Sequence, residues 1–223
     1  MLKKVYYNTV STRLLSTLLF LMKSGEFTMF RLVGGTSLSL QLGHRESVDI
    51  DLFTDSAYDS VDFSAIDKLL KQNFSYVDTF DTEVIGMGKS YYIGDSANHC
   101  VKLDLFYTDT FIRPIIQIDE LRLAGLEEII AMKIDVVARI GRKKDFWDIH
   151  ELLDEFSIQK MLDLHEERYP YAHNREEIVK NFTNFKNADL DFNPICLKGK
   201  YWELIKLDIV EKIQHYNNEL SSS

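Results

Sequence analysis

The segment from Gly34 to Phe53 constrains this chain most, because it joins a glycine turn, a short apolar helix and a pair of acids. Glycine lets a backbone approach a phosphate closely, and the helix expected over residues 36–42 would point its first N–H groups at the same anion. Asp49 and Asp51 are two residues apart, so on a strand they share one face. Two carboxylates on one face repel each other unless a cation lies between them, and Mg2+ carrying nucleotide phosphates is the natural cation. The segment predicts a metal site that handles nucleotides, although a solvated strand edge would also account for the acid pair.

Composition limits the classes of protein that the chain can belong to. With 223 residues, 45% of them hydrophobic and 27% charged, it has the make-up of an ordinary globular protein. The net charge of −9 excludes a surface that is basic all over, so a nucleic-acid partner would need a local basic patch. Cys100 and Cys196 form neither a metal-binding spacing nor a disulfide framework, which fits a reducing, cytoplasmic location.

The start of the chain has no secretory pattern, because Met1 to Lys4 are followed by tyrosines and polar residues. The apolar run from Leu14 to Met22 is too short for a bilayer, which takes about 20 residues. No membrane partner is expected.

Hydrophobic periodicity predicts an α/β first half, residues 1–122, and a helical second half, residues 123–223. Expected helices cover residues 8–23, 36–42, 60–74, 126–140, 146–155, 158–168, 175–185 and 201–219, and expected strands cover residues 30–33, 48–53, 82–85, 90–93, 100–107 and 115–118.

Asp104 is a third candidate carboxylate, placed at the centre of the apolar strand expected over residues 100–107. An unpaired buried charge is costly, so Asp104 lies either on the solvent face of an edge strand or in a functional site. Two-metal phosphoryl transfer requires carboxylates that converge from adjacent strands. Asp104 is therefore expected to join Asp49 and Asp51.

Lys133 projects from the middle of an apolar stripe on the helix expected over residues 126–140, with Glu128 on the opposite side. A lysine there either extends its ammonium group to solvent or meets an anion. The more specific interpretation is that its ammonium group reaches a triphosphate or the metal-site carboxylates as a point charge. Arg142, Lys143 and Lys144 follow as a basic cluster, which is either a solvated loop or a site for polyphosphate or an RNA backbone.

Two stretches resemble the nucleotidyltransferase AbiEii/AbiGii toxin family of the DNA polymerase β-like nucleotidyltransferase superfamily. The first motif is matched by Gly34-Gly35-Thr36, Leu38, Leu40, Gly43-His44-Arg45, Ser47 and Asp49-Ile50-Asp51-Leu52-Phe53. Lys133, followed by Lys144-Asp145-Phe146-Trp147-Asp148-Ile149, resembles the later motifs. The resemblance covers most of residues 28–168.

The resemblance implies an α+β fold: a polymerase β-like mixed sheet with flanking helices, and a helical C-terminal half that completes the active site. It also implies a bacterial enzyme that uses Mg2+ (or Mn2+) to transfer NMP from an NTP to an acceptor. Some members of the family modify tRNA acceptor ends, so tRNA is a candidate acceptor beside a protein or a small molecule. The protein would be the toxin of a toxin–antitoxin pair, with an antitoxin encoded nearby.

The resemblance also implies residue roles. Asp49, Asp51 and Asp104 would be catalytic metal ligands, Lys133 and Asp148 the later essential pair, and Gly34, Gly35, Thr36, Ser37, Arg45 and Lys133 the nucleotide-binding residues. Lys133 would neutralise charge on the leaving pyrophosphate, while Asp148 would orient Lys133 or bind a second metal ion. Arg45 either touches the triphosphate or pairs with a nearby acid. The rival hypotheses are a non-catalytic protein of the same fold that binds NTP or antitoxin, and a structural domain whose acids are solvated.

Overall fold

The computed structural model describes residues 4–79 and 86–221, which form two compact units. Unit 1 comprises residues 1–43 and 47–124, and unit 2 comprises residues 44–46 and 125–223. The chain thus leaves unit 1 for His44–Glu46 and returns at Ser47. The sequence-based boundary lay at residue 122/123, and the compact units divide after Ala124.

Unit 1 is built on a seven-stranded mixed sheet in the order β3-β4-β5-β2-β1-β7-β6. The pairs β2–β5 and β1–β7 are parallel, and the other neighbours are antiparallel. The strands are β1 (Arg31–Leu32), β2 (Asp49–Thr54), β3 (Tyr76–Thr79), β4 (Gly88–Ser96), β5 (His99–Tyr107), β6 (Ile116–Ile118) and β7 (Leu121–Leu123), and the helices are η1 (Tyr7–Thr9), α1 (Thr12–Lys23), η2 (Gly25–Phe27), α2 (Gly34–Leu42) and α3 (Phe63–Asn73).

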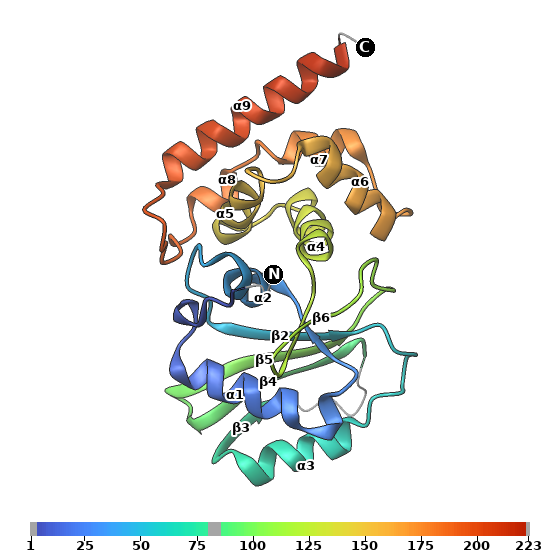
Figure 1. The fold of residues 1–223 in the computed structure, drawn as a ribbon, viewed down its shortest axis with the longest axis vertical. Coiled ribbons are helices and arrows are strands. Elements are labelled where there is room, and N and C mark those ends of the chain that lie inside the picture. Colours follow the sequence, from blue (N-terminus) through green and yellow to red (C-terminus); the bar gives the residue numbers. More distant parts are fainter. Residues whose placement is uncertain (1–3, 80–85, 222–223) are drawn as a thin grey trace. The chain divides into compact units, whose positions relative to one another are not determined.

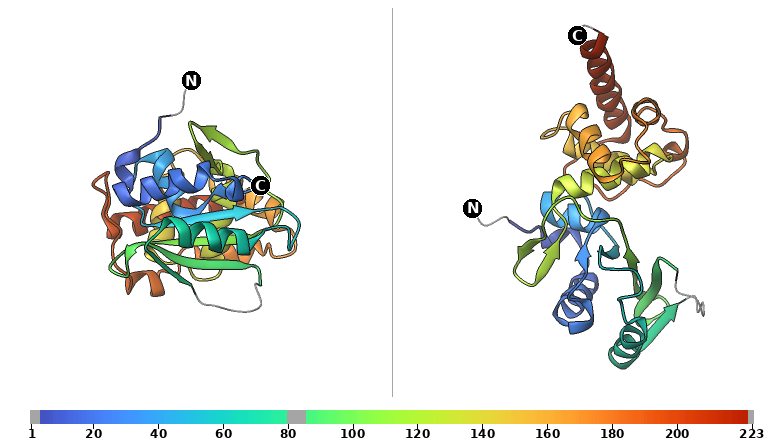
Figure 2. Two further views of the ribbon diagram at one scale, coloured as in Figure 1. Left: turned by 90° about the horizontal axis from the view of Figure 1, so that it is seen from below. Right: turned by 90° about the vertical axis from the view of Figure 1, so that its right-hand side faces the viewer.

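The two faces of β2 and β5 have different environments because side chains alternate along a strand. Ile50 and Leu52 of β2, with Leu103 and Leu105 of β5, are fully buried on one face. The amphipathic helices α1 and α3 cover this face and share its core, and both lie on the same side of the sheet in the right-hand view of Figure 2. The half-buried residues of β2 and β5 form the opposite face, and they include the predicted acids.

Unit 2 consists of helices: α4 (Leu126–Ala138), α5 (Lys143–Leu152), α6 (Ile158–Arg168), α7 (Arg175–Asn181), α8 (Lys186–Asp189) and α9 (Trp202–Ser221) (Figure 1). Its core includes Ile130 and Val137 of α4, Phe146 of α5 and Leu162 of α6. Among the described residues, no helix combines the length and apolar character that a membrane crossing requires.

The burial of two residues of α4 differs from the expected apolar stripe around Lys133, which includes Val136 and excludes Glu128. Val136 is 40% exposed, whereas Glu128, expected opposite the stripe, is fully buried. Glu128 is tolerated there because Arg168 of α6 forms an ion pair and a hydrogen bond with it. Helical periodicity could not reveal a charge partner 40 residues away.

Most predicted elements are present, with shifted ends. The α6 prediction over residues 158–168 is confirmed in full, and the α1 cap is Ser11, whose hydroxyl accepts from Leu14 N–H at 3.1 Å. Helix α5 begins at Lys143, three residues before the prediction, because Asp145 sits inside its first turn and accepts from Arg142 N–H at 3.0 Å. The short strands β3 and β7 were not predicted, and the strand expected over residues 82–85 lies outside the described residues.

Replacing Arg168 with Met should lower the free energy of unfolding by about 3–5 kcal/mol, because the buried Glu128 carboxylate loses its ion pair with Arg168. Adding Glu128→Met should recover most of that loss, since the double variant leaves no buried charge at this position. Urea unfolding measures both. A double variant as unstable as Arg168→Met alone would contradict this account of α4–α6 packing.

Candidate functional site

The acid pair lies on one half-buried face of β2, as the sequence predicted. Parallel pairing with β5 aligns Asp51 with Asp104 and Asp49 with Lys102. The strand period then places all four side chains on the same face of the sheet. We call Asp49, Asp51, Lys102 and Asp104 the acidic strand face.

Asp104 is held by two neighbours. Lys102 Nζ donates to Asp104 Oδ2 at 2.5 Å, and Ser90 Oγ of β4 donates to Oδ1 at 2.7 Å. Burial lowers the pKa of Lys102, but the hydrogen bond to Asp104 and the charges of Asp104, Asp49 and Asp51 outweigh it and raise the pKa above its ordinary value. Lys102 therefore supplies a positive charge that the sequence analysis overlooked. Its position two residues before Asp104 in an alternating strand was the available signal.

The donor chemistry of Asp49 and Asp51 fits a hard divalent cation, which prefers carboxylate oxygens. Among the described residues, no three His, Cys, Asp or Glu side chains are grouped so that they could hold a metal ion. Both Asp104 oxygens accept hydrogen bonds from protein groups. That Asp104 joins Asp49 and Asp51 as a metal ligand stays a prediction.

Gly34 brings the acid pair against the start of α2. Its φ is +66°, a region that favours glycine, and a Cβ there would lie 2.5 Å from Asp51 Oδ2. Val33 N–H donates to the Asp51 carbonyl at 2.9 Å, and the apolar side chain of Val33, the N-cap residue, makes no cap hydrogen bond. The first N–H groups of a helix have no partner within it, so this turn offers backbone donors next to the Asp51 carboxylate.

The hydroxyl groups of Thr36 and Ser37 are engaged inside unit 1. Both residues are fully buried. Thr36 Oγ1 donates to the Asp49 carbonyl and accepts from Ser47 Oγ at 2.8 Å, and Ser37 Oγ donates to the Ala124 carbonyl at 3.3 Å. Thr36 therefore fixes α2 against β2 and Ser37 fixes it beside the end of β7, so phosphate contacts at this turn would depend on backbone N–H groups.

A buried ion cluster in unit 2 contains the other predicted site residues. The fully buried carboxylate of Asp148 accepts from Arg45 Nε at 2.6 Å and Nη2 at 2.9 Å, pairs with His44 Nε2 at 2.8 Å, and lies 2.7 Å from Lys133 Nζ. Lys133 also donates to Asp145 Oδ1 at 2.6 Å. The cluster joins the His44–Glu46 segment to α4 and α5.

This geometry matches one of the alternatives for Arg45, that it pairs with a nearby acid. Arg45 is 3% exposed, and its Nη1 also donates to the Glu46 carbonyl at 2.9 Å. Lys133 does meet anions, but they are Asp145 and Asp148 of its own unit. The prediction that Asp148 orients Lys133 agrees with their contact.

The charges of the cluster set its ionisation. Burial raises the pKa of Asp148, but the charges of Arg45 and Lys133 and the hydrogen bonds from His44 and Arg45 hold it well below its ordinary value. Burial lowers the pKa of Lys133, and the charges of Asp148 and Asp145 more than compensate and raise it. Both groups are therefore charged at neutral pH.

The residues of the basic cluster after α4 differ in their exposure to solvent. Lys143 is buried, donates to the Asp191 carbonyl at 2.6 Å and lies over the Trp202 ring. Arg142 keeps most of its side chain exposed. The area available to an RNA backbone is therefore smaller than three adjacent basic residues suggest.

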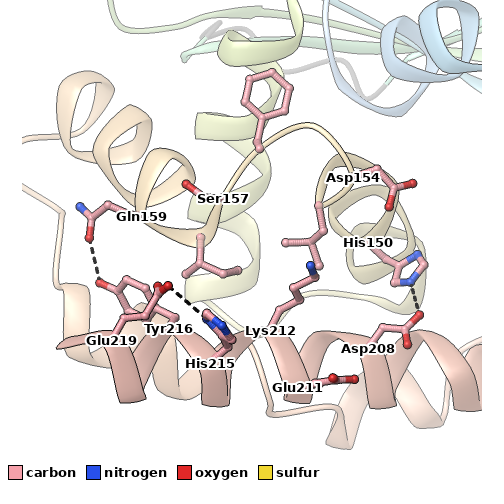
Figure 3. A pocket seen from close by; sticks show the side chains of 13 residues that line it. His150, Asp154, Ser157, Gln159, Asp208, Glu211, Lys212, His215, Tyr216 and Glu219 are labelled. Atoms are coloured by element: carbon pink, nitrogen blue, oxygen red, sulfur yellow. Dashed lines mark hydrogen bonds and ion pairs between the residues drawn. The ribbon is translucent and has the colours of Figure 1, made fainter. Parts of the chain in front are cut away.

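Unit 2 also contains a cavity of about 550 Å³ between the α5–α6 connection and α9 (Figure 3). Two ion pairs lie in its wall: His150 Nε2 lies 2.8 Å from Asp208 Oδ2, and His215 Nδ1 lies 3.3 Å from Glu219 Oε1. None of its lining residues was predicted as a site residue.

Replacing Gly34 with Ala should lower the free energy of unfolding by more than about 1 kcal/mol, because a left-handed residue with a Cβ is strained and the Cβ would collide with Asp51. Gly25→Ala is the matched control, since a Cβ there meets nothing within 4 Å. Urea unfolding compares the two. Equal effects would contradict the close approach of Asp51 to Gly34.

Replacing Asp148 with Asn should cost about 3–5 kcal/mol at pH 7, because it leaves buried cations without their partner. A carboxyl whose pKa is depressed by folding stabilises fully above its unfolded value, near 3.8, and loses this contribution as the pH falls below it. The unfolding free energy of the variant should therefore depend less on pH below about 4. The exposed Asp154→Asn is the control, and an identical acid dependence in wild type and Asp148→Asn would refute the assignment.

Comparison with known proteins shows the family to which the chain belongs. The family model described as "Nucleotidyl transferase AbiEii toxin, Type IV TA system" matches residues 14–214. An uncharacterized protein of Aquifex aeolicus, aq_aa25, is 29% identical over 200 residues, covering 86% of this chain and 82% of that protein.

Two solved structures share the fold. JHP933 from Helicobacter pylori superposes with a TM-score of 0.58 at 18% identity, covering 96% of this chain and 95% of that one. MenT4, the nucleotidyltransferase toxin Rv2826c of Mycobacterium tuberculosis, gives 0.52 at 14% identity, covering 88% and 79%. Since the family model spans most of the chain, this protein belongs to the nucleotidyl transferase AbiEii toxin family of type IV toxin–antitoxin systems and is a nucleotidyltransferase of that family.

Proposed function

We propose that the acidic strand face carries out divalent-cation-dependent transfer of NMP from an NTP to the hydroxyl group of an acceptor. The observation that carries this proposal is the close approach of Asp51 to Gly34, which places a carboxylate against the first turn of α2. One end of that arrangement suits a cation and the other suits phosphate oxygens. Membership of a nucleotidyltransferase family supports the same reaction.

The residues of this face take separate roles in the proposal. Asp49 and Asp51, joined by one oxygen of Asp104, would hold Mg2+ or Mn2+, which when bound neutralises triphosphate charge and polarises the α-phosphate. Backbone N–H groups at Gly34, Gly35 and Thr36 would bind phosphate oxygens. Asp104 would accept the proton of the acceptor hydroxyl, whose oxygen forms the new bond to the α-phosphorus while the bond to pyrophosphate breaks.

The buried ion cluster takes a positioning role. Asp148 holds Arg45, and with it the segment between α2 and β2, through hydrogen bonds of 2.6 and 2.9 Å. Lys133 in turn contacts Asp148 at 2.7 Å. We therefore assign the importance of Lys133, Asp148 and Arg45 to positioning, in place of the predicted contacts with triphosphate or pyrophosphate.

The family supports a nucleotide substrate and a protein partner. A toxin of a type IV toxin–antitoxin system implies a nucleotide substrate and an antitoxin partner. We propose tRNA as the acceptor, with the exposed Arg142 side chain contributing to a small basic area.

A second candidate is a non-catalytic protein of the same fold that binds NTP or antitoxin. The engagement of both Asp104 oxygens by Lys102 and Ser90 favours it, because these donors compete with an acceptor hydroxyl for the carboxylate. Binding of NTP without formation of any product would select this candidate.

Incubation with Mg2+, each labelled NTP and total bacterial tRNA tests the proposed reaction. We expect wild type to label the RNA and Asp51→Ala to lose at least about 90% of that activity, because the cation loses a ligand. Asp78→Asn, which changes an exposed acid of β3 in the same sheet, should keep full activity. Residual activity of Asp51→Ala above a tenth of wild type would refute its role.

A further inference from the structure

The Lys102 side chain lies on the sheet face that carries the three acids. Its Cα partner across β2 is Asp49, and Asp104, two residues further along β5, is paired with Asp51. The Lys102 ammonium thus shares a sheet face with three carboxylates and bonds to one of them at 2.5 Å.

The charges on this face require a cation. Three carboxylates and one ammonium leave two net negative charges, and close carboxylates repel each other. The salt bridge from Lys102 neutralises the charge of Asp104, whose side chain is 15% exposed. It also occupies an oxygen that a divalent cation or an acceptor proton would need.

The Lys102 side chain can vacate this position. It is 36% exposed, and its ammonium sits on a flexible four-carbon stem. The Asp104 carboxylate, by contrast, is also fixed by Ser90 Oγ at 2.7 Å. Movement of the lysine therefore frees one Asp104 oxygen while the other keeps its hydrogen bond.

We propose that Lys102 is a resident counter-cation of the acidic strand face, which a divalent cation must displace from Asp104, so that Lys102 sets the affinity for that cation. The proposal rests on the proposed function, because it requires a cation at Asp49 and Asp51.

Isothermal titration of the full-length protein with Mn2+, without nucleotide, tests this competition. Lys102→Met removes the ammonium and should tighten Mn2+ binding by about tenfold or more, because the competing charge is lost. Lys102→Arg keeps the positive charge and should stay within about threefold of wild type. Lys71→Met, on the exposed surface of α3, changes the net charge equally and should leave the affinity unchanged.

The folded state of each variant is checked by thermal unfolding with and without Mn2+, which should raise the midpoint more for Lys102→Met than for wild type. If wild type binds Mn2+, Asp51→Asn abolishes that binding, and Lys102→Met matches Lys71→Met, the counter-cation role is wrong while the proposed function stands. If wild type and Lys102→Met both fail to bind Mn2+, both proposals fail.

Discussion

Charge balance on one face of the unit 1 sheet is the constraint on which the candidate site depends. The opposite face is apolar and is buried by α1 and α3, so β2 and β5 can present Asp49, Asp51 and Asp104 only on the half-buried face. Carboxylates at this spacing require positive charge nearby. Lys102 supplies part of it, and the absence of a side chain at Gly34 lets the Asp51 carboxylate lie against the first turn of α2.

In unit 2 the charges of the ion cluster and of Glu128 and Arg168 are buried and paired. Asp148 accepts from both His44 and Arg45 and lies against Lys133, and Glu128 pairs with Arg168. Such pairs contribute less to stability than their number suggests, but removing one partner is strongly destabilising. A residue of this cluster can therefore be indispensable without touching the substrate, and substitutions there must be interpreted with the folded state measured in parallel.

The sequence predicted what depends on neighbours along the chain. Alternation identified β2 and the shared face of its acids, and periodicity and caps identified α1 and α6. It did not predict the partners of Arg45, because Asp148 lies 103 residues further along the chain. The short strand β7, whose three residues carry almost no pattern, was missed for a different reason. The spacing of Lys102 to Asp104 predicts that the two share a strand face, whereas its place beside Asp49 depends on the pairing of β5 with β2.

The most direct test of the central claim is a crystal structure of the protein with Mn2+ and a non-hydrolysable NTP analogue, with the metal located by anomalous scattering. The account predicts an anomalous peak bound by Asp49 and Asp51, with triphosphate oxygens at the N–H groups of Gly34 and Gly35. A nucleotide and Mn2+ bound elsewhere in the chain, with the Asp49 and Asp51 carboxylates free of metal, would contradict it.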